Sequence, residues 1–177
     1  MERHFFASAI TGNGFVNYSN TITDGVYTYV LKGGSGSGKS TIIRAIANHF
    51  SSKGYDVELY HCSRDETGLD GVRISGLGIA IVDGTHPHVI EPSIVGITGR
   101  YIDLSGYLDP AIIHERNEIY ARVNSIKELT AKVKSDLASV VKTHNEVERI
   151  YNPYMNFDKV QKVTKDLISD IAKKNKS

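Results

Sequence analysis

The sequence predicts an α/β fold with a mainly parallel sheet flanked by helices, followed by a C-terminal helical hairpin. Apolar, β-branched segments alternate with a helical pattern up to residue 109, and apolar residues recur every seven positions after Pro110. Strand, helix and strand joined by short links are typical of a βαβ unit, which has parallel strands and a right-handed crossover. We therefore expect two parts, residues 1–109 and residues 110–177.

Three strands and one helix are predicted in the first part. The strands are 26–32 (VYTYVLK), 55–62 (YDVELYHC) and 77–84 (LGIAIVDG). The last of these is apolar on both faces, as expected for a central strand of a parallel sheet. Residues 39–53 place apolar side chains at helical spacing, and Gly54 follows as a natural C-terminal stop. The segment 61–71 is expected to be a loop.

The second part predicts a long amphipathic helix. Its seven-residue seam consists of Ile112, Ile119, Ile126, Val133, Val140 and Val147. Pro153 is expected to break this helix, because proline lacks the N–H that continues a helix. A second helix follows, with Val160, Val163, Leu167 and Ile171 on one face. We expect an antiparallel hairpin that folds back on the sheet or packs on a second copy or another domain.

A run of glycine and serine joins the first predicted strand to the helix. It fits the pattern Gly-x-x-x-x-Gly-Lys-Ser of a P-loop, in which backbone N–H groups surround the β-phosphate and the lysine binds the β- and γ-phosphates. The helix that opens at the lysine adds its positive N-terminal end. The predicted nucleotide-binding residues are Gly33, Gly34, Ser35, Gly36, Ser37, Gly38, Lys39, Ser40 and Thr41. The alternative is a flexible glycine linker.

An aspartate at the end of the third predicted strand supports this interpretation. Asp83 follows the apolar run GIAIV, at the carboxyl end of a strand where open α/β sheets bind ligands. In P-loop proteins such an aspartate holds the magnesium beside the P-loop hydroxyl. Ser40 and Asp83 are therefore the predicted metal ligands, and ATP and Mg²⁺ the predicted cofactors. An ordinary aspartate in a turn is the alternative.

The group that activates the attacking water is not obvious from the sequence. No carboxylate directly follows Asp83, where many ATPases have a glutamate. His86 or His88 is a candidate base, although both can also be turn residues bonded to the backbone. In the segment 61–71, Asp65 and Asp70 are candidates for base or acceptor contact. Lys39, Asp65, Asp83 and His86 are thus the predicted catalytic residues.

Charge on a transferring phosphoryl group often comes from an arginine. Candidates are Arg64, Arg73, Arg100 and Arg116. None of them lies in an obvious arginine-rich lid, a segment that nucleoside monophosphate kinases usually have. The sequence therefore favours a kinase less, without excluding it.

Six stretches together support a resemblance: RHFFASAIT, GFVNY, VLKGGSGSGKST, GYDVELYHCS, LDGV and AIVDGTHPHVIEP. With them the chain resembles a poorly characterised family of bacterial P-loop ATPase or nucleotide-kinase-like proteins in the P-loop NTPase superfamily. The resemblance implies nucleotide binding through Gly38, Lys39, Ser40 and Asp83. It also implies a common cleft lined by His61, Cys62, Ser63, His86 and His88. Family members often carry two such units in tandem, so a second P-loop unit is an implied partner.

Three functional hypotheses follow. The first is a Mg²⁺-dependent ATPase, the second a kinase that transfers the γ-phosphoryl group to a nucleotide or small molecule bound near residues 61–73. The third is a nucleotide-dependent switch with little turnover, whose long helix carries the output to a partner or a second subunit. ATP is favoured over GTP partly because a guanine-reading Asn/Thr-Lys-x-Asp pattern is absent.

The composition restricts the partners. The net charge of +1 argues against a general nucleic-acid role. No run reaches the roughly 18 apolar residues of a membrane span. The single cysteine, Cys62, rules out an internal disulfide and fits a cytoplasmic protein. We expect a nucleotide as ligand and a second P-loop unit or a homo-oligomer through the helical arm.

Overall fold

The computed structural model of the chain describes residues 1–86 and 89–174. Its first part contains a six-stranded sheet with the strand order β1-β5-β6-β7-β4-β8. These strands are β1 (Glu2–Phe6), β4 (Tyr27–Lys32), β5 (Val57–Cys62), β6 (Asp65–Ile74), β7 (Ile79–Asp83) and β8 (Gly99–Asp103). A separate antiparallel hairpin consists of β2 (Ser8–Thr11) and β3 (Gly14–Asn17).

The α-helices are α1 (Asn20–Thr23), α2 (Lys39–Ser52), α3 (Arg116–Tyr151) and α4 (Phe157–Lys174). Short 3₁₀ turns are η1 (Ser75–Leu77), η2 (Ser105–Tyr107), η3 (Pro110–Glu115) and η4 (Asn152–Tyr154). The α/β class is therefore confirmed, and β4, α2, β5 and β7 lie within the segments predicted from the sequence.

The sheet is mixed, so the expectation of a mainly parallel sheet is corrected. Three strand pairs are parallel, β1–β5, β4–β7 and β4–β8, but β6 is antiparallel to both of its neighbours. Only Ser63 and Arg64 separate β5 from β6. A link of two residues can form a hairpin but is too short for the crossover that parallel strands need. The predicted loop 61–71 was therefore wrong, because β6 occupies most of it.

The two faces of the sheet bury different side chains. Leu31 of β4 packs with Ile43 and Ala47 of α2, whereas the adjacent Val30 packs with Ile22 of α1 on the opposite face. This alternation follows from the period of two in a β-strand, and the spacing of four between Ile43 and Ala47 keeps both on one side of a helix. The sheet thus lies between α2 and α1, and this packing fixes the ends of β4 and β7.

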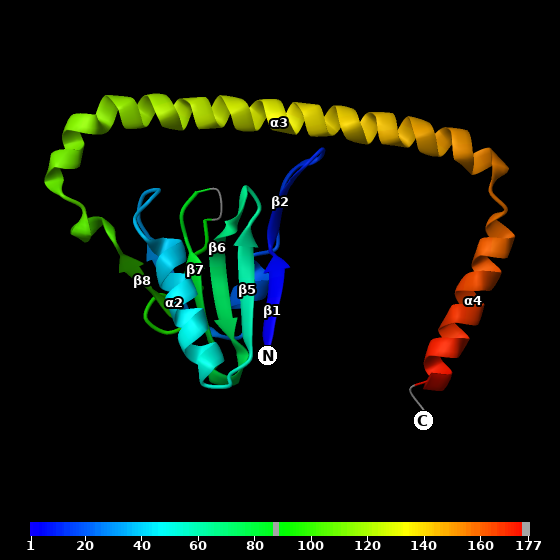
Figure 1. Cartoon of the computed structure of the whole chain (residues 1–177), viewed down its shortest axis with the longest axis horizontal. Helices are drawn as coiled ribbons and strands as arrows, with labels where there is room; N and C mark the ends of the chain where they lie inside the picture. Colours follow the sequence, from blue (N-terminus) through cyan, green and yellow to red (C-terminus); the bar gives the residue numbers. More distant parts are fainter. Residues whose placement is uncertain (87–88, 175–177) are drawn as a thin grey trace.

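The long helix α3 runs across one edge of the sheet, above the carboxyl ends of β4, β5 and β7 (Figure 1). The α-helix begins at Arg116, because the preceding residues, from Pro110 to Glu115, form the 3₁₀ turn η3. Its 36 residues extend for about 54 Å at 1.5 Å per residue. No residue of α3 is buried. The helix therefore spans the sheet edge as a bridge rather than lying flat on a face.

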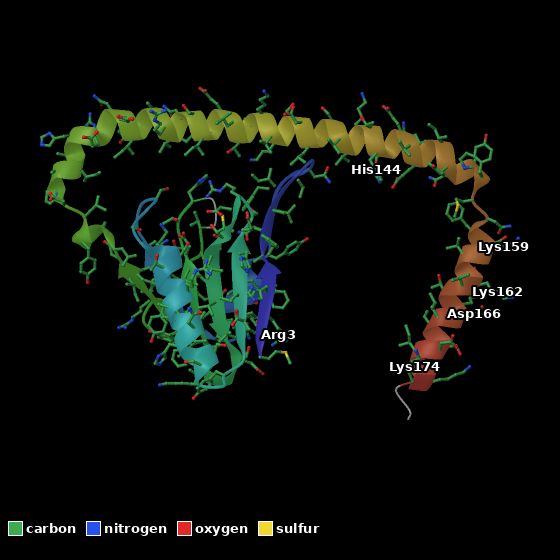
Figure 2. The ribbon with its side chains drawn as sticks, viewed as in Figure 1. Arg3, His144, Lys159, Lys162, Asp166 and Lys174 are labelled. Carbon is green, nitrogen blue, oxygen red and sulfur yellow. The ribbon has the colours of Figure 1, made fainter. Side chains whose placement is uncertain are left out.

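The predicted antiparallel hairpin of the two helices was wrong. After η4, α4 turns away from the axis of α3 and does not return along it (Figure 1). Pro153 lies within η4, and the Asn156 side chain accepts the N–H of Lys159 to start α4 in its new direction. All described residues of α4 are exposed, including Lys159, Lys162 and Asp166 (Figure 2). Pairing of the apolar seams with a second copy or a second unit stays a prediction.

Among the described residues, no helix combines the length and the apolar character that a membrane crossing requires.

The β2–β3 hairpin rises from the sheet to contact α3 (Figure 1). Gly12 at its tip faces the helix so closely that a Cβ there would lie 2.6 Å from Val141 Cγ2 and 2.9 Å from the Leu137 carbonyl oxygen. The hairpin therefore holds α3 near its middle, and the contact requires a residue without a side chain.

We expect Gly12→Ala to detach this hairpin from α3. Overpacking of this kind costs about 1–3 kcal/mol, so amide hydrogen exchange of residues 8–17 should become roughly 10- to 100-fold faster. Asn13→Ala is the control, because Asn13 is exposed at the same tip and only its backbone N–H is bonded, to Thr11. Equal exchange rates in the two variants would contradict the contact.

Candidate functional site

The glycine-rich loop 33–38 connects β4 to α2 at the edge that α3 crosses. Gly36 and Gly38 have φ values of +77° and +89°, which glycine adopts without the penalty that a Cβ brings. Gly38 is the N-cap of α2, and its carbonyl accepts the first helical hydrogen bond, from the Ile42 N–H. Lys39, Ser40 and Thr41 lie between Gly38 and Ile42. Their N–H groups have no partner within the helix and point out of its positive end. This arrangement of N–H groups can bind an anion.

Lys39 lies inside this loop. Its side chain is only 8% exposed, and its ammonium donates to the carbonyl oxygens of Gly33 and Gly34 at 2.8 Å each. The Asp83 carboxylate is 3.7 Å away. A full positive charge is thus held at the mouth of the loop by neutral carbonyls and one carboxylate.

Asp83 reaches this position because β7 pairs in parallel with β4. The register places Asp83 opposite Leu31, two residues before the loop. One carboxylate oxygen of Asp83 accepts the Thr85 N–H at 2.8 Å and the Thr85 hydroxyl at 2.5 Å, while the other faces Lys39. Its side chain is 16% exposed. The aspartate is therefore oriented by Thr85 and still open on one side.

Ser40 is bonded to β6, a strand that the sequence did not predict. Its hydroxyl donates to the Leu69 carbonyl at 3.1 Å and accepts the Leu69 N–H at 3.3 Å. A hydroxyl has one hydrogen and two lone pairs, so one lone pair of Ser40 remains for a ligand. The contact fixes the first turn of α2 against the centre of the sheet.

One cavity of about 670 Å³, here called the loop cavity, brings most predicted site residues together. The loop contributes Ser35, Gly36, Ser37, Gly38, Lys39, Ser40 and Thr41. The other lining residues are Cys62, Arg64, Asp65, Gly68, Asp70, Asp83, Thr85, His86 and Ile126. All four predicted catalytic residues, Lys39, Asp65, Asp83 and His86, thus share one cavity. Gly33 and Gly34 do not line it and serve as acceptors for Lys39.

Only part of the cleft implied by the family resemblance lies at this cavity. Cys62 and His86 line it, whereas His61 stacks on His4 and bonds to the Glu66 backbone. Ser63 lines a neighbouring cavity. His88 falls outside the described residues.

Asp65 is exposed at the start of β6. Its carboxylate accepts the hydroxyl of Thr67 at 2.6 Å and the Thr67 N–H at 3.0 Å. These two hydrogen bonds, the hydroxyl first, lower the pKa of Asp65 below its usual value. A carboxylate with a lowered pKa is a weak general base, so Asp65 is better suited to an electrostatic role.

Only one of the four candidate arginines lines the loop cavity, and it is Arg64. Arg73 donates to the backbone carbonyls of Thr21, Ile22 and Asp24, and Arg100 lies over the Tyr29 ring. Arg116 begins α3. Arg73 and Arg100 are therefore structural, and Arg64 is the arginine that can supply charge.

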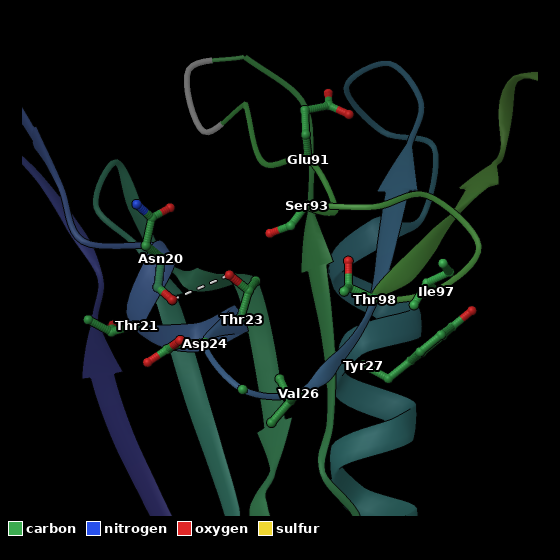
Figure 3. Close-up of a pocket in the computed structure, with 11 residues that line it drawn as sticks. Asn20, Thr21, Thr23, Asp24, Val26, Tyr27, Glu91, Ser93, Ile97 and Thr98 are labelled. Carbon is green, nitrogen blue, oxygen red and sulfur yellow. Dashed lines mark hydrogen bonds between the residues drawn. The ribbon is translucent and has the colours of Figure 1, made fainter.

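A separate hollow of about 660 Å³ lies beside α1 and shares no residue with the loop cavity (Figure 3). It contains two carboxylates, Asp24 and Glu91. Glu91 is already paired with Lys32 at 2.7 Å and with the Tyr101 hydroxyl. Among the described residues, none of the predicted site residues lines this hollow.

Sequence reasoning missed the part of the cavity that α3 supplies. Ile126 belongs to the seven-residue apolar seam, which indicated a helix partner rather than a cavity wall. Among the described residues, no three His, Cys, Asp or Glu side chains form a metal cluster by themselves.

Comparison with known proteins gives no match: no family model, no curated protein and no solved structure matches the chain.

Proposed function

We propose that the chain is a P-loop NTPase that binds Mg·ATP at the glycine-rich loop and hydrolyses it. One observation carries the proposal. The buried Lys39 ammonium, the free N–H groups of the α2 N-terminus and the Asp83 carboxylate surround a single cavity. Phosphate needs this combination of cation and N–H donors, and a metal beside it needs a carboxylate.

Triphosphate oxygens would take the place of the Gly33 and Gly34 carbonyls as acceptors for Lys39. Both bonds are 2.8 Å long, so the ammonium already lies where a strong acceptor is bound. A phosphate oxygen adds the attraction between two opposite full charges, which a neutral carbonyl does not offer to the ammonium. The exchange therefore favours the bound nucleotide.

The residues present fit a magnesium ion that is shared with the phosphates. Ser40 keeps one lone pair, and Asp83 keeps one carboxylate oxygen that Thr85 does not use. Magnesium commonly takes one or two protein oxygens and completes its shell with water and substrate phosphate. When bound, it would neutralise charge that develops on the transferred phosphoryl group. A three-carboxylate cluster is not required.

His86 is the better of the two candidates for positioning the attacking water. It lines the cavity after β7, the strand that pairs with β6, and it follows Thr85, which orients the Asp83 carboxylate. Asp65 is held ionised by Thr67 and has little tendency to take a proton. We therefore assign the positioning of the attacking water to His86 and an electrostatic role to Asp65.

Removal of the metal tests this proposal. We expect ADP release from ATP to require Mg²⁺, to stop with excess EDTA and to return when Mg²⁺ is restored. Asp83→Asn keeps an acceptor for Thr85 but loses the charge, so it should need at least roughly tenfold more Mg²⁺ for half-maximal turnover. Metal-independent turnover, or no ATP binding in calorimetry, would contradict the proposal.

Transfer to an acceptor is the second candidate function, because a second cavity adjoins the loop cavity and shares Ser35, Arg64, His86 and Ile126 with it. A kinase releases ADP faster when its acceptor is present, whereas an ATPase does not. The switch hypothesis stays a prediction; it requires ATP binding with little turnover and a change in exposure of α3.

A further inference from the structure

We propose that the cavity under α3 binds a second ligand, a phosphomonoester that also carries a flat aromatic ring, as a nucleoside monophosphate does. This second cavity has a volume of about 550 Å³ and lies between the β2–β3 hairpin, the β5–β6 link and α3. The ligand class is argued from this cavity alone. It rests on the proposed function only in that the second ligand is expected beside Mg·ATP.

One wall of the second cavity is apolar. Ile10 and Phe15 are register partners in the β2–β3 hairpin, so their side chains share one face of it. Val123 and Ile126 of α3 line the same cavity. Aliphatic side chains and a phenyl ring provide the contacts that a flat aromatic ring needs.

The other wall is cationic. Arg64 lies in the β5–β6 link, and Lys127 and Lys134 lie two helical turns apart on α3. In the part of the chain that the structure describes, no hydrogen bond or ion pair engages the side chains of these three residues. Of the described residues that line the cavity, none is an aspartate or a glutamate. Three uncompensated cations would attract a group with two negative charges, as a phosphomonoester has near neutral pH.

The two adjoining cavities therefore select different ligands. The loop cavity has three aspartates, Asp65, Asp70 and Asp83, which suit a metal-bound phosphate chain. The second cavity offers cations without carboxylates and suits an anion that brings no metal. Because Arg64 and His86 line both cavities, a ligand in the second one lies beside the phosphate end of a nucleotide in the first.

The hairpin contact holds α3 on the C-terminal side of this wall, where Gly12 lies against Leu137 and Val141. On the N-terminal side, η2 and η3 connect α3 to β8. Residues 123–134 lie between these two points, so the hairpin contact limits how far the lysines can move from the cavity.

Calorimetric titration of the full chain with AMP tests the inference. Adenosine supplies the ring without the charge, and inorganic phosphate the charge without the ring. We expect AMP to bind at least roughly tenfold more tightly than either, because both walls contribute. Equal affinity for AMP and one of these fragments would overturn the proposal, as would failure of all three to bind.

Variants of α3 locate the binding. Lys127→Ala and Lys134→Ala should each weaken AMP binding about 10-fold or more, since each removes a charged donor. Lys132→Ala is the matched control, because Lys132 is an exposed lysine of the same helix that does not line the cavity. Unchanged AMP affinity in both variants would overturn the assignment.

A titration with AMP in the presence of a saturating, non-hydrolysable Mg·ATP analogue separates this inference from the proposed function. We expect AMP to stay bound, with its affinity changed by less than about tenfold, because the ligands occupy different cavities that share Arg64 and His86. Displacement of AMP by the analogue would overturn the second site. If the chain does not bind the analogue, the proposed function fails, but the titration of AMP alone still tests the second cavity.

Discussion

Lys39→Ala should lower Mg²⁺-dependent ADP release by roughly 100- to 1000-fold, the loss seen when one preorganised electrostatic donor is removed from a phosphate or oxyanion site. Lys39 is the lysine whose ammonium is held within the loop, bonded to Gly33 and Gly34. Its charge is largely shielded from water, which strengthens its interaction with an anion. Steady-state ADP release and calorimetric ATP binding measure the loss.

Lys53→Ala is the matched control for this variant. Lys53 follows the last turn of the same helix and is exposed, at the end opposite the loop. Circular dichroism shows whether each variant keeps its helical content. Turnover of Lys39→Ala within threefold of the unchanged chain would contradict the role given to the loop, whereas an equal loss in both variants would indicate a general effect on the fold.

The centre of the site was predictable because local signals and tertiary packing agree there. A β-branched strand, a glycine-rich loop and an apolar helical pattern follow one another between residues 26 and 53, and each corresponds to an element of the structure. The register of β7 on β4 then places Asp83 beside the loop. Short links and buried strands leave few other arrangements.

The strand β6 was not predictable from its own residues. It contains Asp65, Gly68, Asp70 and Gly71, residue types that disfavour strands. Pairing with both β5 and β7 stabilises it, and such contacts are invisible in a local pattern. Gly71 also permits close approach, since a Cβ there would lie 3.3 Å from the Ile81 carbonyl. This strand holds Ser40 through Leu69, so the error extended into the site.

The residues that α3 contributes to the two cavities were missed for a different reason. The periodicity of residues 112–147 predicted a helix, which the structure forms from Arg116 onward, but the pattern does not show what the faces of the helix contact. Lys127 and Lys134 lie seven residues apart and Val123 lies four residues before Lys127, so the cationic and apolar groups of one wall were present in the sequence. Their meeting with Arg64 depends on where α3 crosses the sheet edge, which the hairpin contact at Gly12 helps to fix.

Gly84→Ala should destabilise the fold by about 1–3 kcal/mol and also reduce turnover. A Cβ on Gly84 would lie 2.2 Å from Val30 Cγ1 and 3.2 Å from the Ile90 carbonyl. Val30 is fully buried and β-branched, so it cannot rotate away. The backbone after β7 would have to shift instead. Urea unfolding gives the change in free energy.

The shift would be felt in the site because Gly84 directly follows Asp83. The Gly84 N–H donates to the Leu31 carbonyl at 3.0 Å, and this bond ties the end of β7 to β4. If it lengthens, Asp83 moves away from Lys39, and ADP release should need more Mg²⁺ even in the fraction that stays folded. Gly106→Ala is the control, since a Cβ on Gly106 meets nothing within 4 Å. Equal unfolding free energies for the two variants would show that the β7 end tolerates the added methyl group.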